Sequence, residues 1–348
     1  MFYIHQTSCI SSQHTFRDAD INILYEPVEK KLRAIEPSYD GIPPGILRRM
    51  GLAVRLGVGA ALNVLQNNPT PDGIIIGTAN GGNEDSVKFL NQIIEYDEGL
   101  LTPINFVQST PNAVAAQIGL LTNNHCYNIT HLQIGLAFEF AMTDADMMLN
   151  ENPLNSYLIG AVDDISTNNY YFEDKGGWYK NEDVSGKALY ETNSPGSIAG
   201  EAAAMFLVNR NKTGSVAKVL AVDTLHNEDP SVVKERLQVF IGKYLPEGEK
   251  LDLLLTGENG DNRLFKYYSS CESVLNEDVT VARFKHMSGE YPTATAMGLW
   301  LCCELLQKQY IPDHMIKRAI ANGKYKNVLI YNNYKSIQHS FILVTIPC

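Results

Sequence analysis

The chain has 348 residues, of which 45% are hydrophobic and 19% are charged, so it holds ample apolar material for a buried core. Its formal net charge of −11 makes nucleic acid or an anionic membrane surface an unfavourable partner. No apolar stretch reaches the roughly 18 residues of a membrane span, and the first residues lack a basic segment followed by a long apolar run. We therefore expect a globular cytoplasmic protein without a membrane span.

Along the first half of the chain, apolar runs alternate with segments of helical periodicity, as in α/β proteins. The strand-like runs are residues 2–10, 73–77, 127–130 and 157–162. The helix-like segments between them are residues 47–66, 110–121 and 132–149.

The second half repeats this order. Its strand-like runs are residues 202–208, 216–222, 251–255, 327–331 and 341–346, and its helix-like segments are 232–244 and 292–308. Between the halves, residues 166–195 are polar and aromatic without clean periodicity, and we interpret them as an excursion. We expect a duplication: an N-terminal half of residues 1–195, which includes the excursion, and a C-terminal half of residues 196–348.

Six cysteines are scattered without C-x-x-C spacing, so neither a zinc site nor a disulfide framework is expected. Two acidic pairs, Asp163 with Asp164 and Glu258 with Asp261, follow strand-like runs, where acidic turn residues are common. We interpret them as turn residues and expect no bound metal and no cofactor.

Five short motifs follow one another in a familiar order. Residues 3–11 (YIHQTSCIS) are similar to V-x-I-T-G-x-G-x-I-S with its glycines lost, and residues 77–82 (GTANGG) are similar to G-T-x-x-G-G. Residues 111–119 (PNAVAAQIG) are similar to P-N-x-x-A-G-x-I-A, and residues 200–204 (GEAAA) are similar to G-E-G-A-G. Residues 285–298 (KHMSGEYPTATAMG) are similar to K-x-x-x-G-H-T-x-G-A-A-G. In this order the chain resembles the β-ketoacyl synthase family of the thiolase superfamily. The resemblance implies an α/β fold of the duplicated thiolase-like kind, five-layered αβαβα and normally dimeric.

The nucleophile of the family is absent from its expected place. Active members carry cysteine in T-A-C-x-S-G on a strand-to-helix elbow, where the helix N-terminus lowers the thiol pKa and a backbone N–H completes the oxyanion hole. The matching stretch, residues 128–135 (NITHLQIG), holds no cysteine. If Gly135 matches the motif glycine, Leu132 occupies the slot, whereas a shift of one residue brings in Gln133 or His131. The Gln133 register is similar to that of chain-length-factor subunits, which carry glutamine there.

Both catalytic histidines of the family are also replaced. The H-G-T motif falls on residues 255–261 (LTGENGD), where Thr256 stands for histidine, and the second histidine falls on Glu290. A carboxylate cannot donate the neutral N–H hydrogen bonds by which imidazole stabilises an enolate. Lys285 matches the family lysine, and we expect Glu290 to be a buried structural carboxylate bonded to Lys285 or to backbone N–H groups.

The C-terminal gate of the family is lost as well. Its N-x-F-G-F-G-G-x-N loop falls on residues 331–339 (YNNYKSIQH), which contain no glycine. We therefore expect neither the swinging phenylalanine gate nor its flexibility.

These losses imply a noncatalytic ketosynthase-like subunit, similar to a chain length factor. Such a subunit forms a heterodimer with an active β-ketoacyl-ACP synthase in type II fatty-acid, polyketide or aryl-polyene-type biosynthesis. The short chain and degenerate loops are most similar to ketosynthase-like proteins of the aryl polyene and flexirubin pathways. An acyl carrier protein would then be met through the partner, since Arg48 and Arg49 form the only obvious basic cluster here.

Residues 110–141 are the expected interface, because they are mostly apolar or small and include Glu139 as their one charged residue. An apolar surface of that size needs a covering subunit, either the catalytic ketosynthase packed across the strand at 127–130 or, failing that, a second copy of the chain.

The alternative is an active 3-oxoacyl-ACP synthase or other acyltransferase, so the sequence leaves open whether the protein is an enzyme. It would use Cys126, with His125 beside it and His131 near, or an unconventional residue near His131. Cys126 lies about six residues before the expected elbow, roughly 20 Å along an extended strand, and a structural thiol is the simpler interpretation.

Overall fold

The computed structural model describes residues 1–66, 68–99, 101, 103–320 and 324–347. In this part of the chain one eleven-stranded sheet runs through the molecule in the order β11-β10-β9-β12-β13-β8-β1-β7-β5-β3-β4. None of the described helices is long and apolar enough to cross a membrane.

The strands form two groups with the same internal order. The first group is β1 (Phe2–Ile10), β3 (Gly73–Gly77), β4 (Tyr127–His131), β5 (Ser156–Asp163) and β7 (Ala202–Asn209). The second is β8 (Ala217–His226), β9 (Leu253–Thr256), β10 (Thr280–Arg283), β12 (Asn327–Tyr334) and β13 (Gln338–Thr345). We number the five strands of each group in chain order. In both groups the first strand pairs antiparallel with the fifth, and the fifth pairs antiparallel with the fourth. The fourth then pairs parallel with the second, and the second pairs parallel with the third. The expected duplication is therefore confirmed.

The helices follow the same division. The first repeat contains α1 (Pro44–Leu47), α2 (Leu52–Leu65), α3 (Asn83–Glu95), α4 (Pro103–Gln108), α5 (Ala113–Thr122), α6 (Ala137–Glu151) and α7 (Thr167–Lys175). The second contains α8 (Pro230–Tyr244), α9 (Phe265–Glu272), α10 (Lys285–Ser288) and α11 (Ala294–Lys308). The short elements are β2 (Lys31–Leu32), β6 (Ala199–Gly200), β11 (Ile316–Arg318), η1 (Ile134–Leu136), η2 (Lys187–Tyr190) and η3 (Asp313–Met315).

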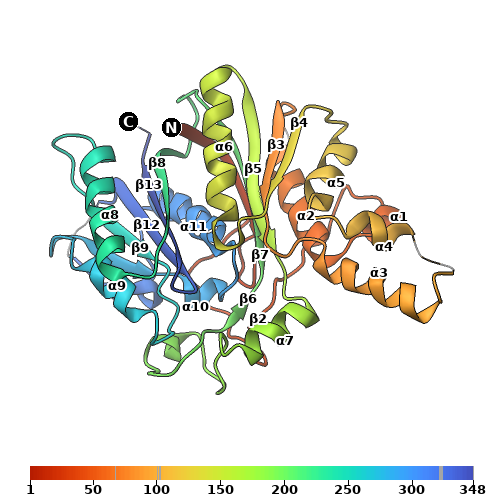
Figure 1. The fold of residues 1–348 in the computed structure, drawn as a ribbon. Helices are drawn as coiled ribbons and strands as arrows, with labels where there is room; N and C mark the ends of the chain where they lie inside the picture. Colours follow the sequence, from red (N-terminus) through yellow and green to blue (C-terminus); the bar gives the residue numbers. More distant parts are fainter. Residues whose placement is uncertain (67, 100, 102, 321–323, 348) are drawn as a thin grey trace.

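Alternating strand residues divide the interior into three cores and so create the five layers. On β3, Ile74 and Ile76 pack with α2 and α5, while Ile75 faces the central core that holds α6 and α11. On β9, Leu253 and Leu255 face that central core, while Leu254 packs with α8 and α9. Both faces of each half-sheet are covered, as the unbroken apolar runs require. The layers are visible in Figure 1, where α6 and α11 lie between the outer helices α2 and α5 and the outer helices α8 and α9.

The boundary at residue 195 remains a prediction. Because β7 pairs with β1 and β5, the strand order places it in the first repeat, and we propose a boundary in the connection between β7 and β8, residues 210–216. The excursion 166–195 then lies within the first repeat, and it contains α7, whose N-cap Ser166 accepts from Asn169 N.

Two expected helices begin five residues later than their periodicity indicated. The helix expected at residues 47–66 begins at Leu52, because the chain turns at residues 48–51. The Gln108 side chain holds this turn by accepting from Gly51 N (2.8 Å) and donating to the carbonyl oxygen of Arg49. The helix expected at 132–149 is preceded by η1 and begins at Ala137.

A close approach of two glycines joins the repeats. A Cβ atom on Gly200 would lie 2.0 Å from the carbonyl oxygen of Ser288, and one on Gly289, whose φ is +69°, would lie 2.6 Å from Gly200 Cα. β6 can therefore meet the segment before α11 only because both positions lack side chains.

We expect Gly200→Ala to lower the free energy of unfolding by about 1–3 kcal/mol, because backbone must move to admit the methyl group. Gly242→Ala is the matched control, since this exposed glycine of α8 has no neighbouring atom within 4 Å of an added Cβ. It should stabilise the protein by about 0.5–1 kcal/mol through helix propensity. Chemical denaturation measures both changes, and equal effects of the two substitutions would contradict the close approach.

Candidate degenerate active site

The expected site positions meet at the carboxyl ends of the parallel strands. β4 ends at His131 and β9 at Thr256, while Lys285 and Glu290 follow β10. The β12–β13 hairpin closes the same end of the second repeat. The fold therefore brings together the stretches that the motifs marked, apart from Cys126.

The strand-to-helix turn after β4 holds no nucleophile. Its bend lies at Ile134, whose φ of +54° is a conformation that a branched side chain rarely adopts. The three candidates for the slot precede it, and of these His131 bonds Asp144 Oδ2 through Nε2 (2.9 Å) while Leu132 is 46% exposed. No sequence signal marked Ile134, because nothing in its residue type favours a positive φ. Neither Ile134 nor Leu132, Gln133 or His131 supplies a thiol or hydroxyl.

The backbone amide at this turn is already bonded within the protein. Gly135 N–H donates to Gln338 Oε1 (2.9 Å), and Gln338 Nε2 donates to the carbonyl oxygen of Gln133 (3.2 Å). Tyr334 packs so closely that a Cβ on Gly135 would lie 2.5 Å from it. An oxyanion hole needs a free N–H aimed at a substrate oxygen, and here a side chain of the hairpin takes that N–H.

The hairpin itself is the stretch where the family carries its gate. It turns at Lys335 and Ser336, which both have positive φ, and Ser336 N–H donates to Asn333 Oδ1 (3.0 Å). Lys335 Nζ forms an ion pair with Glu173 of α7. The stretch is thus a paired hairpin tied to the excursion.

The expected pairing of Lys285 with Glu290 is confirmed. Lys285 Nζ lies 2.8 Å from Glu290 Oε1, and Asn259 Nδ2 donates to Glu290 Oε2 (2.7 Å). Lys285 is fully buried and Glu290 is 9% exposed. The Glu290 backbone bridges to the first repeat, because its N–H donates to the Ile198 carbonyl (2.7 Å) and its carbonyl accepts from Gly200 N–H (3.1 Å). Glu290 is therefore fully engaged in structure.

Thr256 is fully buried at the end of β9, and its Oγ1 accepts from Glu258 N–H (3.3 Å). The hydroxyl that stands where the family has histidine thus helps to shape the turn of residues 256–261. Within this turn Asp261 N–H donates to Asn259 Oδ1 (3.1 Å), which orients the amide that bonds Glu290.

The excursion closes over this site. Lys180 Nζ is buried and donates to the carbonyl oxygen and Oγ of Ser194 and to the carbonyl oxygen of Gly260. Arg263 donates to the Gly177 carbonyl (2.8 Å) and lies over the Trp178 ring. The pocket left between the excursion and Glu290 has a volume of about 30 Å³, room for one or two water molecules. It cannot hold an acyl chain in this conformation.

Three of the four acidic residues, Asp163, Glu258 and Asp261, form bonds that stabilise the fold. Asp163 Oδ1 accepts from Thr78 Oγ1, Ala79 N and Asn80 N, and its Oδ2 accepts from Thr293 Oγ1, at 2.8–3.0 Å. Glu258 pairs with Arg283 and Lys317, and Asp261 pairs with Arg263. Among the described residues, no group of three or more His, Cys, Asp or Glu side chains could hold a metal ion.

Cys126 lies away from the other positions. It is exposed and precedes β4, whereas the turn at Ile134 follows the other end of that strand. Its backbone N–H donates to Asn124 Oδ1, and the neighbouring His125 bonds Asn123. The imidazole of His131 is bonded to Asp144 and so is directed at a carboxylate of α6.

A chain of hydrogen bonds holds α10, the helix that presents Lys285. His286 Nδ1 lies 3.1 Å from Tyr190 Oη, His286 Nε2 lies 2.8 Å from His314 Nδ1, and His314 Nε2 lies 2.9 Å from the Ile21 carbonyl. The carbonyl can only accept, so every bond is satisfied when both imidazoles are neutral. Burial, followed by the nearby His314 and Arg283, lowers the pKa of His286 to about 3.

Removing one member of the Lys285–Glu290 pair should cost about 3–5 kcal/mol of unfolding free energy, because the other charge stays buried without its partner. Glu290→Gln is the informative change, since it keeps the shape and the bond from Asn259. Glu290→His should also destabilise the protein and create no malonyl decarboxylation. Asp278→Asn is the control, because its pair with Lys250 is exposed and should be worth less than about 1 kcal/mol. Similar losses for both amide variants would refute a structural role of Glu290.

Acidification should destabilise the protein through His286. In the unfolded chain the imidazole has a pKa near 6.5, whereas in the folded protein its pKa is lower. As pH falls from about 6.5 towards 3, protons therefore bind the unfolded state preferentially, and the free energy of unfolding decreases. At pH 5 this contribution amounts to about 2 kcal/mol relative to pH 7. The difference in unfolding free energy between wild type and His286→Gln should shrink by that amount between pH 7 and pH 5. A difference that does not change with pH would show that His286 does not titrate in this way.

Comparison with known proteins agrees with this geometry. Residues 26–182 match the family model of the beta-ketoacyl synthase N-terminal domain. No curated protein sequence matches the chain.

Three solved structures share the fold over nearly the whole length. A beta-ketoacyl synthase from Burkholderia phymatum STM815 has 12% sequence identity and a TM-score of 0.79, with 99% of each chain covered. The ishigamide ketosynthase/chain length factor has 14% identity and a TM-score of 0.76, with 100% of this chain and 99% of that chain covered. The ketosynthase ApeO in complex with its chain length factor ApeC, from Xenorhabdus doucetiae, has 12% identity and a TM-score of 0.78, with coverage of 99% and 98%. The chain therefore has the five-layered thiolase-like fold of these ketosynthase structures over nearly its whole length, and its match to the β-ketoacyl synthase family model covers residues 26–182.

Proposed function

We propose that this protein is a noncatalytic, chain-length-factor-like subunit that forms a heterodimer with an active β-ketoacyl-ACP synthase. The pair would work in the cytoplasm, in type II biosynthesis of fatty-acid, polyketide or aryl-polyene type. One observation carries the proposal: the position matched to the second catalytic histidine is a buried carboxylate whose two oxygens accept from Lys285 and Asn259. A group held in that way cannot act on an enolate.

The rest of the site supports the same conclusion. The turn at Ile134 offers no nucleophile, and the Gly135 N–H that could stabilise an oxyanion is bonded to Gln338. We propose that Ile134 itself occupies the nucleophile position, because the sharp strand-to-helix bend lies there. The excursion leaves a pocket of about 30 Å³ above Glu290, so substrate would have to be bound by the partner.

The surface around β4 is suited to a partner subunit. β4 is an edge of the sheet, and an uncovered edge strand is a template for pairing with another chain. Large apolar side chains are exposed on the elements beside it: Leu120 of α5, Tyr127 of β4, Leu132 and Ile134 of the turn, and Phe140 and Met147 of α6. An apolar patch next to an open strand edge is typical of an interface between subunits.

Three similar structures bear on the kind of partner. The ishigamide and ApeO–ApeC structures each contain a ketosynthase with a chain length factor, and a third similar structure is described as a type II polyketide acyl-carrier protein bound to its ketosynthase, with 12% identity and a TM-score of 0.75. By analogy we propose that the covering subunit supplies the nucleophile and that the carrier protein meets the complex through it. The net charge of −11 fits this, since carrier proteins are acidic.

The isolated protein should neither become acylated nor decarboxylate a malonyl carrier, whereas a mixture with its ketosynthase should condense normally. Intact mass spectrometry after incubation with an acyl donor tests the first part, and a condensation assay tests the second. An acyl adduct on Cys126 that disappears in Cys126→Ser would overturn the proposal in favour of an active acyltransferase.

Charge placed beside β4 should separate the subunits. Ile134→Lys and Phe140→Lys bury a lysine in the proposed interface, and each should weaken the complex by at least about 30-fold, equivalent to about 2 kcal/mol. Phe172→Lys is the control, because Phe172 is 69% exposed on α7. Co-purification with the ketosynthase and sedimentation measure the effect. Wild-type yields of complex from both interface variants would place the partner elsewhere.

A further inference from the structure

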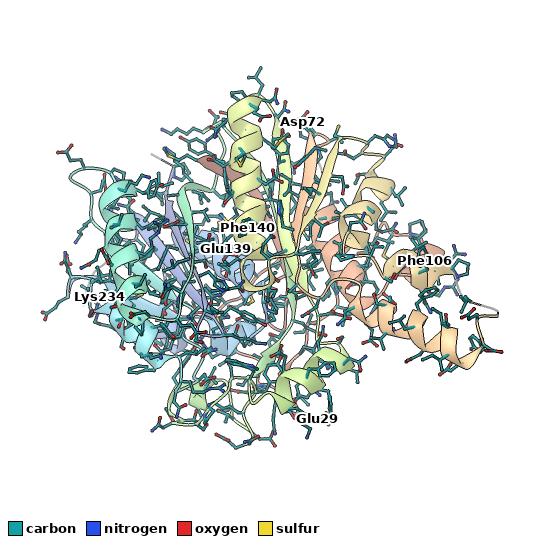
Figure 2. The ribbon with its side chains drawn as sticks, viewed as in Figure 1. Glu29, Asp72, Phe106, Glu139, Phe140 and Lys234 are labelled. Atoms are coloured by element: carbon teal, nitrogen blue, oxygen red, sulfur yellow. The ribbon has the colours of Figure 1, made fainter. Side chains whose placement is uncertain are left out.

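Glu139 of α6 is a buried acid that the Lys285–Glu290 pair does not use. It is fully buried, and neither of its carboxyl oxygens forms a hydrogen bond with the described residues. Figure 2 shows it in the middle of the molecule, near the end of α6 that follows the turn. A buried polar group without a partner is rare in folded proteins and calls for a physical explanation.

Two hydroxyl groups of the second repeat face this carboxyl group. Thr295 lies in the first turn of α11 and Ser340 lies on β13, and both are close enough to lower the pKa of Glu139. Thr295 Oγ1 and Ser340 Oγ are themselves buried, and neither has a hydrogen-bond partner in the described part of the chain. Four polar atoms from three elements therefore converge on one interior point between the repeats.

The charges nearby favour an uncharged Glu139. An isolated carboxylate in an apolar interior costs several kcal/mol. Lys285 is the cation that acts on Glu139, but its ammonium group is 2.8 Å from Glu290. One lysine thus stands beside two carboxyl groups. Burial raises the pKa of Glu139, and Ser340, Thr295 and Lys285 oppose that rise more weakly.

We propose that Glu139 is a neutral carboxylic acid at pH 7 and that it binds one internal water molecule together with Thr295 and Ser340. A protonated carboxyl group donates one hydrogen bond and accepts others, and each hydroxyl does the same. Buried waters typically make about three hydrogen bonds to otherwise unsatisfied polar groups, and these three side chains supply that number. The site would be a hydrated contact between the two repeats beneath the degenerate active site.

Glu139→Gln tests the charge of the acid. An amide has the size and the mixed donor and acceptor character of a neutral acid, so the thermal midpoint should stay within about 1 °C of wild type at pH 7. Glu201→Gln is the matched control. Glu201 is equally buried but accepts from the N–H groups of Ala34 (2.9 Å) and Ile165 (2.8 Å), an acceptor-only role that an amide cannot fully reproduce. Its midpoint should fall by several degrees.

Infrared difference spectroscopy reads the proton directly. The difference spectrum of Glu139→Gln minus wild type at pH 7 should show a negative carbonyl band, because the variant has lost one protonated carboxylic acid. An ionised carboxylate has no such band. No lost band, or a fall in midpoint as large as that of Glu201→Gln, would overturn the proposal. A cation effect would also overturn the proposal. In that case added Na⁺ or K⁺ at constant ionic strength would raise the thermal midpoint of the wild type but not that of Glu139→Gln, which would show that an ionised Glu139 binds a cation.

The water is tested on the wild-type protein, so this arm does not depend on any variant folding. A high-resolution crystal structure should show one ordered water within hydrogen-bond distance of Glu139, Thr295 and Ser340. Direct hydrogen bonds among the three side chains, with no density between them, would refute the water site. Thr295→Val and Ser340→Ala should each lower the thermal midpoint, and their effects should be non-additive because they share the same water.

Discussion

The buried ion pair between Lys285 and Glu290 is the interaction on which the junction of the two repeats depends. Its charges are out of water, so each requires the other, and Asn259 supplies the remaining bond to the carboxylate. The Glu290 backbone extends the same contact to Ile198 and Gly200 of the first repeat. One residue therefore ties the start of α11, the turn after β9 and the short strand β6 to one another.

This structural use of Glu290 supports the proposal that the site does not perform ketosynthase chemistry. Each oxygen of the carboxylate already accepts a hydrogen bond, and the surrounding elements pack into the same space. Tyr334 packs against Gly135, Gln338 takes its N–H, and the excursion is fastened above by Lys180. The proposed loss of catalysis would thus be spread over several contacts, so restoring one histidine would leave the site filled.

Most of the apolar surface of the molecule is covered by its own helices, but one region of it is exposed. Both faces of each half-sheet are covered by helices, which satisfies the strands that are apolar on every residue. The edge at β4 and the helices beside it are different, because large apolar side chains remain exposed there. Such a surface suits a protein that acts through another subunit, which is the basis of the function proposed above.

The sequence by itself determined the α/β class, most of the strands and the absence of cysteine from residues 128–135. Runs such as Gly73–Gly77 are apolar on every residue, and a missing thiol is visible without a structure. The pairing of Lys285 with Glu290 was predictable too, because they lie five positions apart and a buried carboxylate near a helix start needs a cation. Several elements were missed: α3, although its apolar residues recur at helical spacing, and the short elements α4, α9 and β10.

Only the tertiary structure decided which groups meet across the repeats. The bond from Gly135 to Gln338 joins residues 203 positions apart, and the meeting of Glu139 with Ser340 has a similar separation. Periodicity tells which face of an element is buried, but it does not tell what lies opposite. The bend at Ile134 was hidden for a related reason, because neighbouring packing imposes a backbone conformation that its own side chain disfavours.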